Sequence, residues 1–194
     1  MSADRDFPSH LRPVPDSGDS TAPQLDPATG TPGLTPPLSR GRSQGFITDV
    51  LVELGCVSQE RVEQAVEAAR TAGAPPEALL LTEGVINGDQ LSRAVAERYG
   101  LDHVDLSAYQ VDMAAANLIS VNTARRYRAL PVGFVDKQTL LVAMADPTNV
   151  LAVDDIQIAT GLDCKVAVAA EDDIEALVTR LNTLQSAVTE AITE

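Results

Sequence analysis

Basic and metal-binding side chains are scarce in this chain of 194 residues. Lys and Arg number 14 against 28 Asp and Glu, and the net charge is −14. Nucleic acid and anionic membranes repel a surface of that sign, so we expect neither as a partner. The two cysteines and two histidines show no CxxC or clustered His spacing, which predicts that there is no metal site. No apolar run is long enough to cross a bilayer, so we also expect no direct membrane insertion.

Sequence motifs for catalysis are also missing. The chain contains no GxxxxGK phosphate loop, no GxSxG and no HExxH. The pair Asp154–Asp155 and the triplet Glu171–Asp173 are candidate acid groups, but adjacent residues on a helix do not face one point. We interpret them as solvated helix faces or as partners of helix N-termini. The sequence therefore predicts no catalytic residue, no cofactor and a chain that is not itself an enzyme.

The few cysteines and histidines are widely separated. Cys56 and Cys164 fall on different predicted elements. A disulfide between them stays open, although two reduced, buried thiols in a cytosolic protein are the favoured interpretation. His10 and His103 are isolated from each other and from the cysteines. His10 lies in the first 45 residues, and we interpret His103 as a surface residue.

The first 45 residues differ in composition from the rest. They hold eight of the twelve prolines and five of the twelve glycines, and they show no apolar periodicity. Five Asp and four Arg lie there, so nearly all of the net negative charge belongs to the remainder. Such a segment cannot bury enough apolar surface to offset the entropy of ordering. We predict a disordered tail over residues 1–45, without the features of a secretory signal.

A helical unit occurs twice, as "LVELGCVSQERVEQAVEAAR" and "LLTEGVINGDQLSRAVAERY", at an offset of 29 residues. The matched positions include Leu51 and Leu80, Gly55 and Gly84, and Val62 and Leu91. Apolar residues recur at helical spacing, and the glycine is typical of a helix C-terminus. Each copy predicts a short helix, a glycine turn and a longer helix, the second longer helix starting at Asn87 or Asp89. Two such pairs can bury their inner faces by stacking into a small bundle.

The second half has a mixed pattern. Two short helices are expected first, and then two β-type runs around the polar turn "DKQT" predict a hairpin. A helix capped by Asp146, with Pro147 at its first position, is expected to run to Gly161. A third strand and a last helix follow. The expected elements are helices at 112–118 and 122–127, strands at 130–135, 140–145 and 164–169, and a final helix over 170–184.

These patterns predict an α+β fold. It consists of a small helical bundle of two repeated helix-turn-helix units, followed by a small α/β layer with a three-stranded sheet covered on one side by helices. The expected divisions are a tail at 1–45, a helical repeat subdomain at 46–104, an α+β subdomain at 105–185, and a linker toward an absent domain at 186–194.

Three arginines interrupt the acidic surface in the segment "ARRYRAL". Arg125, Arg126 and Arg128 surround Tyr127 just before the predicted hairpin, and we call these four residues the arginine patch. One interpretation is a docking patch for an acidic partner or for phosphate. The other is that the arginines compensate nearby carboxylates, since surface ion pairs are worth only about 0–1 kcal/mol.

The stretch from Phe46 to Leu184 resembles the N-terminal domain of the assembly ATPases of type II secretion and type IV pilus systems. The resemblance lies in "LVELGCVS", "LSRAVAERYGLDHVDLSAY", "ARRYRALPVGF" and above all "LLVAMADPTNVLAVDDIQIATG". It implies a cytoplasmic, non-catalytic docking or regulatory module, held at the inner membrane through a platform protein or another secretion or pilus partner. A downstream ATPase or other catalytic domain is the second expected partner. A phosphate loop beyond Glu194 would support the motor version, and a gene ending there would support a free-standing adaptor.

One branch of this family binds cyclic di-GMP through the doubled unit, with an Arg-Leu-Gly start and a late Gln in each copy. Here the first positions read Phe46-Ile47-Thr48 and Pro75-Pro76-Glu77, and Ala69 and Arg98 replace the two Gln. The residues that still match the family pattern are the apolar residues that pack between helices and the glycines that form the turns. The candidate nucleotide-binding residues are therefore Leu51, Gly55, Leu80, Gly84 and Arg98.

The resemblance accordingly favours a repeat that is retained as architecture. We expect no cyclic di-GMP binding, because the residues that would touch the nucleotide are replaced and Glu77 would repel it. The alternative is a cyclic di-GMP sensor with a divergent contact set, in which Arg98 replaces a lost arginine.

Overall fold

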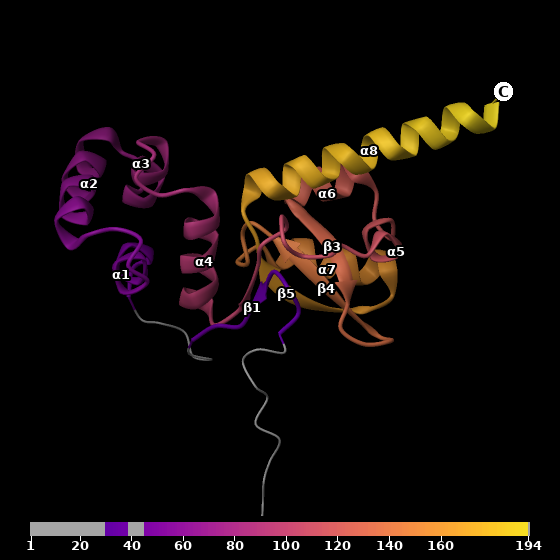
Figure 1. The fold of residues 1–194 in the computed structure, drawn as a ribbon, viewed down its shortest axis with the longest axis horizontal. Coiled ribbons are helices and arrows are strands. Elements are labelled where there is room, and N and C mark those ends of the chain that lie inside the picture. Colours follow the sequence, from indigo (N-terminus) through magenta and orange to yellow (C-terminus); the bar gives the residue numbers. More distant parts are fainter. Residues whose placement is uncertain (1–29, 39–44, 194) are drawn as a thin grey trace, which may run out of the picture.

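The computed structural model describes residues 30–38 and 45–193, which form a helical part and a sheet-containing part (Figure 1). The first part is built from α1 to α4, and the second from the sheet with α5 to α8. The helices are α1 Ile47–Glu53, α2 Gln59–Ala72, α3 Pro76–Thr82, α4 Gly88–Tyr99, α5 Met113–Ala116, α6 Val121–Tyr127, α7 Val150–Thr160 and α8 Glu171–Thr193. The predicted α+β class is confirmed.

The sheet has five strands within the described residues, in the order β1-β2-β5-β4-β3. The three inner strands β2, β5 and β4 are parallel, and the edge strands β1 and β3 each pair antiparallel with a neighbour. The strands are β1 Leu34–Thr35, β2 Asp102–Val104, β3 Ala129–Phe134, β4 Thr139–Met144 and β5 Asp163–Val168. The predicted hairpin corresponds to β3 and β4, and the third predicted strand to β5.

Local sequence signals begin and end the repeated helices. The side chains of Ser58 and Asn87 each accept a hydrogen bond from a backbone N–H three residues on, at 3.4 and 2.8 Å, so they cap α2 and α4. Gly55 and Gly84 follow α1 and α3 with φ of 70° at both positions. Residues that carry a side chain rarely adopt this left-handed backbone conformation, which explains why both copies have glycine there.

Two separate hydrophobic cores support the two parts. The helical core contains Leu51 and Leu80, both fully buried, with residues from all four helices around them. The second core spans the sheet, α5 to α8 and their connections. Every residue of β4 from Leu140 to Met144 is buried. Since successive side chains of a strand point to opposite faces, β4 is covered on both faces rather than on the single side that the sequence predicts.

The strand count differs from the predicted three because two strands are very short. β1 has two residues and β2 has three, too few for an alternating pattern to be recognised. β2 lies within residues 46–104, which the sequence assigns to the helical repeat subdomain. It pairs with β5, so it belongs to the sheet.

The expectation of a structureless tail is wrong for residues 30–38. The carbonyl of Gly33 accepts a hydrogen bond from the backbone N–H of Asp105 at 2.8 Å. Gly33 has φ of 78°, and a Cβ there would lie 2.5 Å from the backbone nitrogen of Tyr109, so only glycine fits. The backbone N–H of Leu38 reaches the carboxylate of Glu97 in α4. Residues 1–29 and 39–44 of the predicted tail lie outside the described residues.

Two helix boundaries also differ from the prediction. α7 begins at Val150 and is capped by Asn149, because the Asp146 carboxylate instead accepts bonds from the backbone and hydroxyl of Thr148 in a local turn. α8 continues through the predicted linker as far as Thr193, consistent with the absence of a stop signal there. Within the described residues, no helix combines the length and hydropathy needed to span a membrane.

Candidate functional site

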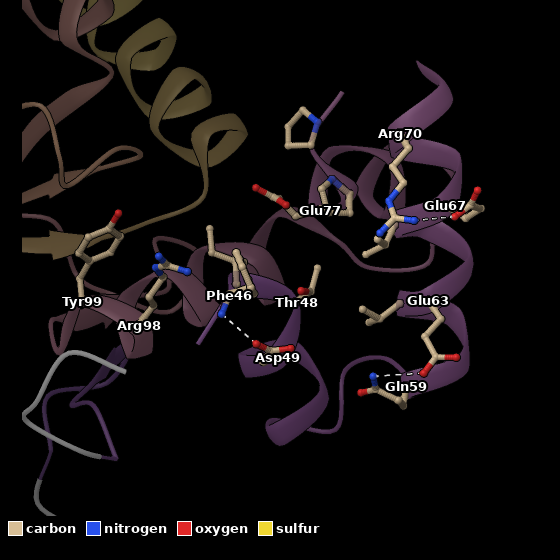
Figure 2. Close-up of a pocket in the computed structure, with 15 residues that line it drawn as sticks. Phe46, Thr48, Asp49, Gln59, Glu63, Glu67, Arg70, Glu77, Arg98 and Tyr99 are labelled. Atoms are coloured by element: carbon tan, nitrogen blue, oxygen red, sulfur yellow. Dashed lines mark hydrogen bonds and ion pairs between the residues drawn. The ribbon is translucent and has the colours of Figure 1, made fainter. Parts of the chain in front are cut away.

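A cavity of about 860 Å³ lies between the two copies of the repeat (Figure 2), and we call it the repeat cavity. Its walls come from the N-terminal ends of α1 and α3, one face of α2 and the C-terminal end of α4. Phe46 and Ile47 supply apolar surface on one side, and Val62 and Val66 on the other. Pro75–Pro76 adds rigid apolar surface at the start of α3, where proline fits the first turn of a helix.

Charged side chains around the repeat cavity give it a negative balance. Its four carboxylates are Asp49, Glu63, Glu67 and Glu77, and its two arginines are Arg70 and Arg98. Arg70 pairs with Glu67 at 3.2 Å, and Arg98 donates a hydrogen bond to the carbonyl of Gly45 at 2.6 Å. Both arginines are therefore already engaged, while the carboxylates outnumber them. Such a lining disfavours an anionic ligand.

The predicted nucleotide-binding residues are not brought together at the repeat cavity. Leu51 and Leu80 are fully buried in the helical core, and Gly55 and Gly84 lie at the C-terminal ends of α1 and α3. The repeat cavity is lined by the opposite, N-terminal ends of those helices, so only Arg98 of the five lies in it.

The positions where the resemblance expects nucleotide contacts do lie together. Residues 46–48 and 75–77 and Arg98 all line the repeat cavity, and Figure 2 shows Glu63, Glu67 and Arg70 along the facing wall from α2. Ala69, at the other expected Gln position, is buried, and its neighbour Arg70 reaches the cavity instead. The sequence analysis identified the two tripeptides only as positions where the expected Arg-Leu-Gly is missing. The structure places both tripeptides in the lining of the repeat cavity.

The arginine patch lies at the C-terminal end of α6, where part of it is compensated. Arg128 makes two contacts to the Glu171 carboxylate, at 3.1 and 3.2 Å, and the Tyr127 hydroxyl donates to Asp155. That bond raises the pKa of Tyr127 because it favours the protonated hydroxyl. The Arg126 guanidinium lies 5.2 Å from the centre of the Tyr127 ring.

The other arginines of the patch lack such compensation. Within the described part of the chain, no ion pair engages Arg125 or Arg126, and both are exposed. A hollow of about 220 Å³ between α6 and α8 is lined by Arg125 and Arg128 with the carboxylates Glu171 and Glu175. The charge of Arg128 is therefore balanced by Glu171, whereas the charges of Arg125 and Arg126 are available to an acidic partner.

His103 is buried rather than at the surface as predicted. Its Nε2 lies 3.0 Å from the Ser92 hydroxyl and 3.3 Å from an Asp89 carboxylate oxygen, so it links β2 to α4. Burial lowers the pKa of His103, and the charge of Asp89 opposes this shift. The sequence signal that could have indicated this contact is Ser92, a small polar residue on a helix face that had no predicted partner.

Glu97 is a second structural residue that the sequence did not single out. Its carboxylate oxygens accept the backbone N–H of Leu38 at 2.9 and 3.1 Å, and the side chain is 8% exposed. It therefore holds residues 30–38 against α4. No local pattern signals such a long-range contact.

The cysteines and acidic groups form no reactive centre in the part of the chain that is described. Cys56 and Cys164 are free and half-buried, each beside a different core, and burial raises the pKa of the Cys164 thiol. No group of three His, Cys, Asp or Glu residues could hold a metal ion among the described residues.

Sequence comparisons place the chain near pilus ATPases. The MshEN domain family matches residues 99–188. The type IV pilus assembly ATPase PilB of Myxococcus xanthus is 27% identical over 136 residues, 70% of this chain and 24% of that protein. PilB of Thermus thermophilus is 35% identical over 128 residues, 66% of this chain and 14% of that protein. The chain thus spans about a quarter or less of the length of the curated relatives it matches.

Two solved structures are similar to the chain over most of its length. A structure of MshE with cdg has a TM-score of 0.57 and 30% identity, covering 71% of this chain and 99% of that one. The N-terminal domain of XpsE has a TM-score of 0.51 and 25% identity, covering 74% of this chain and 98% of that one. Nearly all of each solved chain is matched, whereas the MshEN family match leaves out α1 to α3 and all of α4 except Tyr99.

Proposed function

Because this chain belongs to the MshEN-containing family of N-terminal domains of type II secretion and type IV pilus assembly ATPases, we propose that it is a non-catalytic docking or regulatory module of such a system. The observation that carries the proposal is the extent of the match. It covers 98% of the XpsE N-terminal domain structure and a quarter or less of each PilB. The lack of a phosphate loop in the sequence supports it, since motor activity would then depend on another domain.

The proposed partners are an inner-membrane platform or other secretion or pilus proteins, together with a downstream ATPase or other catalytic domain. We propose a cytoplasmic protein that reaches the inner membrane through such a partner. The net charge of −14 supports protein-mediated rather than direct attachment, because anionic lipid headgroups repel it.

The arginine patch offers a direct test of docking. Arg125→Glu combined with Arg126→Glu reverses the two charges that have no ion pair within the described residues. If the patch is the contact surface, affinity for the cytoplasmic domain of the platform protein falls by about tenfold or more. Arg93→Glu with Lys137→Glu, which also reverses two exposed cations that have no ion pair within the described residues, is the matched control, with an expected loss below about twofold. Platform binding that survives the patch change, with unchanged melting, would remove the patch from the proposal.

A second candidate function is cyclic di-GMP sensing. The repeat cavity and Arg98 favour it, together with the 30% identity to a structure of MshE with cdg. The excess of carboxylates over arginines in the cavity opposes it, so we expect no binding.

Calorimetric titration of the chain with cyclic di-GMP, backed by thermal melting, separates the two functions. A ligand at 100 times its Kd would stabilise the fold by roughly 2.7 kcal/mol, which a melting curve would resolve. A heat of cyclic di-GMP binding that the wild type shows and the Arg98→Ala variant does not would favour the sensor. Heat that persists in Arg98→Ala would mean a sensor with other contacts. No heat and no melting shift would leave docking as the proposed function.

A further inference from the structure

The outward face of α7 carries exposed aliphatic side chains. Val150, Leu151 and Ile158 are 64%, 72% and 82% exposed, among the most exposed large hydrophobic residues of the sheet-containing part. Leu151 and Ile158 are seven residues apart, which is close to two helical turns, so they lie on one face. Asp154 projects from the same face between them. We call Val150, Leu151, Asp154 and Ile158 the α7 face.

The opposite side of α7 is also apolar. Ala152 and Ile156 are fully buried against the second core. A surface helix usually has one apolar stripe and one polar face, so aliphatic side chains on two opposite sides of α7 are unusual for a helix with one side exposed. Single exposed aliphatic residues are ordinary, but a group of three on a helix of 11 residues is characteristic of an interaction surface.

The segment of chain that carries the α7 face is acidic, and Lys165, which follows it, is paired with Asp102 at 2.6 Å. Residues 139–164 contain four Asp and no Lys, Arg or His. A hollow of about 460 Å³ adjoins Ile158 and is lined by Leu162, Gln157 and Gly161 with the carboxylates of Asp154 and Asp163. In the part of the chain that is described, no hydrogen bond or ion pair engages either of these carboxylates. An aliphatic strip beside two uncompensated negative charges complements a partner with aliphatic and basic side chains.

We propose that the α7 face binds an amphipathic helix of a partner protein, with aliphatic residues packed on Leu151 and Ile158 and a Lys or Arg placed between Asp154 and Asp163. This inference rests on the proposed docking function and gives it a surface and a partner chemistry. An amphipathic helix bound in this way carries apolar anchors at i, i+3 or i+4, and i+7. Anchors seven residues apart on the partner can reach both Leu151 and Ile158, which are themselves seven residues apart. A second copy of the chain is disfavoured because its own acidic strip would be repelled, and an anionic membrane is disfavoured for the same reason.

A defined probe tests the proposal on the full chain. The probe is a labelled helical peptide of about 18 residues with leucines on one face and lysines on the other, compared with an analogue in which glutamates replace the lysines. Fluorescence anisotropy should detect binding of the lysine peptide that weakens as salt is added, and no binding of the glutamate peptide.

Three variants locate the binding. Leu151→Ser with Ile158→Ser should weaken peptide binding by about tenfold or more, because two aliphatic contacts are lost. Asp154→Asn with Asp163→Asn should weaken it by several-fold, about threefold or more, and flatten its salt dependence. The matched control is Phe134→Ser with Val135→Ser, two residues of the β3–β4 hairpin that are 44% and 50% exposed. This control should change the affinity for the peptide by less than about twofold. All these positions are at the surface, and a melting curve for each variant checks that the fold is kept.

Several outcomes would overturn the inference. They are peptide binding that is unaffected by the serine pair, loss that is equal in the hairpin control, and binding of the glutamate peptide. Dimerisation in sedimentation equilibrium, or sedimentation with phosphatidylglycerol vesicles, would also overturn it if either depends on Leu151 and Ile158. Measuring the same serine pair against the platform domain keeps the two proposals apart. Platform binding that does not need the α7 face leaves the docking function standing and removes this inference, whereas absence of any platform binding removes the docking function itself.

Discussion

The first copy of the repeat, α1 and α2, and the second copy, α3 and α4, share an inner face but have different outer faces. On the side of α2 that faces away from the helical core, Glu63 and Glu67 are exposed and line the repeat cavity. The equivalent positions of α4, 29 residues on, are Ser92 and Ala96, both buried. α4 packs against β2 and β5, and a methyl group added at Gly88 would lie 3.5 Å from Cβ of Ala170.

The difference between the outer faces shows that the repeated unit has two structural roles, core formation and contact with the sheet. The shared apolar positions form each helix pair and the core between the pairs. The unshared outer positions decide which copy contacts the sheet, because small side chains allow close approach and glutamates favour water. The first copy thus remains free to form one wall of the repeat cavity, and the second joins the two parts of the molecule.

The largest expected effect tests whether the inner faces are equivalent. Leu51→Ala and Leu80→Ala each remove a fully buried side chain of the helical core, so each should lower the free energy of unfolding by about 2–5 kcal/mol. Urea denaturation measures both. Losses that differ by more than about 2 kcal/mol would show that the two copies do not share one core equally.

A smaller effect should separate the outer faces. Glu97→Ala leaves the backbone N–H of Leu38 without its carboxylate, and we expect a loss of about 1–3 kcal/mol. Ala68→Glu, at the equivalent exposed position of α2, is the control and should change stability by less than about 0.5 kcal/mol. Hydrogen exchange of the Leu38 amide gives a local readout. Unchanged protection in Glu97→Ala would contradict the role assigned to this carboxylate.

The glycine turns should respond alike in both copies. Gly55 and Gly84 have the same φ of 70°, and a Cβ at either would meet no atom within 4 Å. The cost of Gly55→Ala or Gly84→Ala is therefore backbone strain alone, about 1–2 kcal/mol for each. Thermal melting of the two variants measures it. A much larger loss at one position would reveal a contact present in only one copy.

The smallest expected effect depends on pH and arises where α4 of the second copy contacts β2. Burial holds the pKa of His103 below its ordinary 6.5, so the unfolded chain binds this proton more readily and stability falls as the pH drops below 6.5 toward the folded pKa. Arg93 adds to this shift, and Asp89, Asp105 and Asp173 oppose it.

Asp173 has the opposite sign. Burial raises its pKa above 3.8, so the folded chain binds this proton more readily and stability rises as the pH falls through the folded pKa toward 3.8. His103→Gln isolates the histidine contribution. Between about pH 8 and about pH 5, the wild type should lose more stability than this variant, as measured by urea denaturation. Equal losses would mean that His103 does not titrate at the interface.

Much of the fold followed from patterns within short segments. Ser58, Asn87 and the glycines after α1 and α3 mark the ends of the repeated helices, and apolar runs predict β3, β4 and β5, because helix caps and strand periodicity act between neighbours in sequence. β1 and β2 are too short to show a period in the sequence. β2 forms by pairing with β5, and β1 forms by pairing with β2.

The candidate site was less predictable. Leu51 and Leu80 were selected because they repeat, but a repeated apolar residue is most often part of a core, and both are buried there. Arg98 was selected at an expected contact position, and it lies in the repeat cavity. Arg70 was not selected, because its approach to the cavity depends on how α2 faces α1, which no local pattern specifies.

The sequence by itself determined the two helical units, the glycine turns between them, the hairpin and the acidic character of the chain, since each depends on residues close together or on a sum of charges. Only the tertiary structure decided that residues 34–35 join the sheet, that His103 is buried against α4 and that two diverged tripeptides share one cavity. It also decided that one face of α7 stays exposed. These outcomes depend on contacts between residues far apart in the chain, where the gain from burial must exceed the entropy of closing long loops, and no local pattern contains that balance.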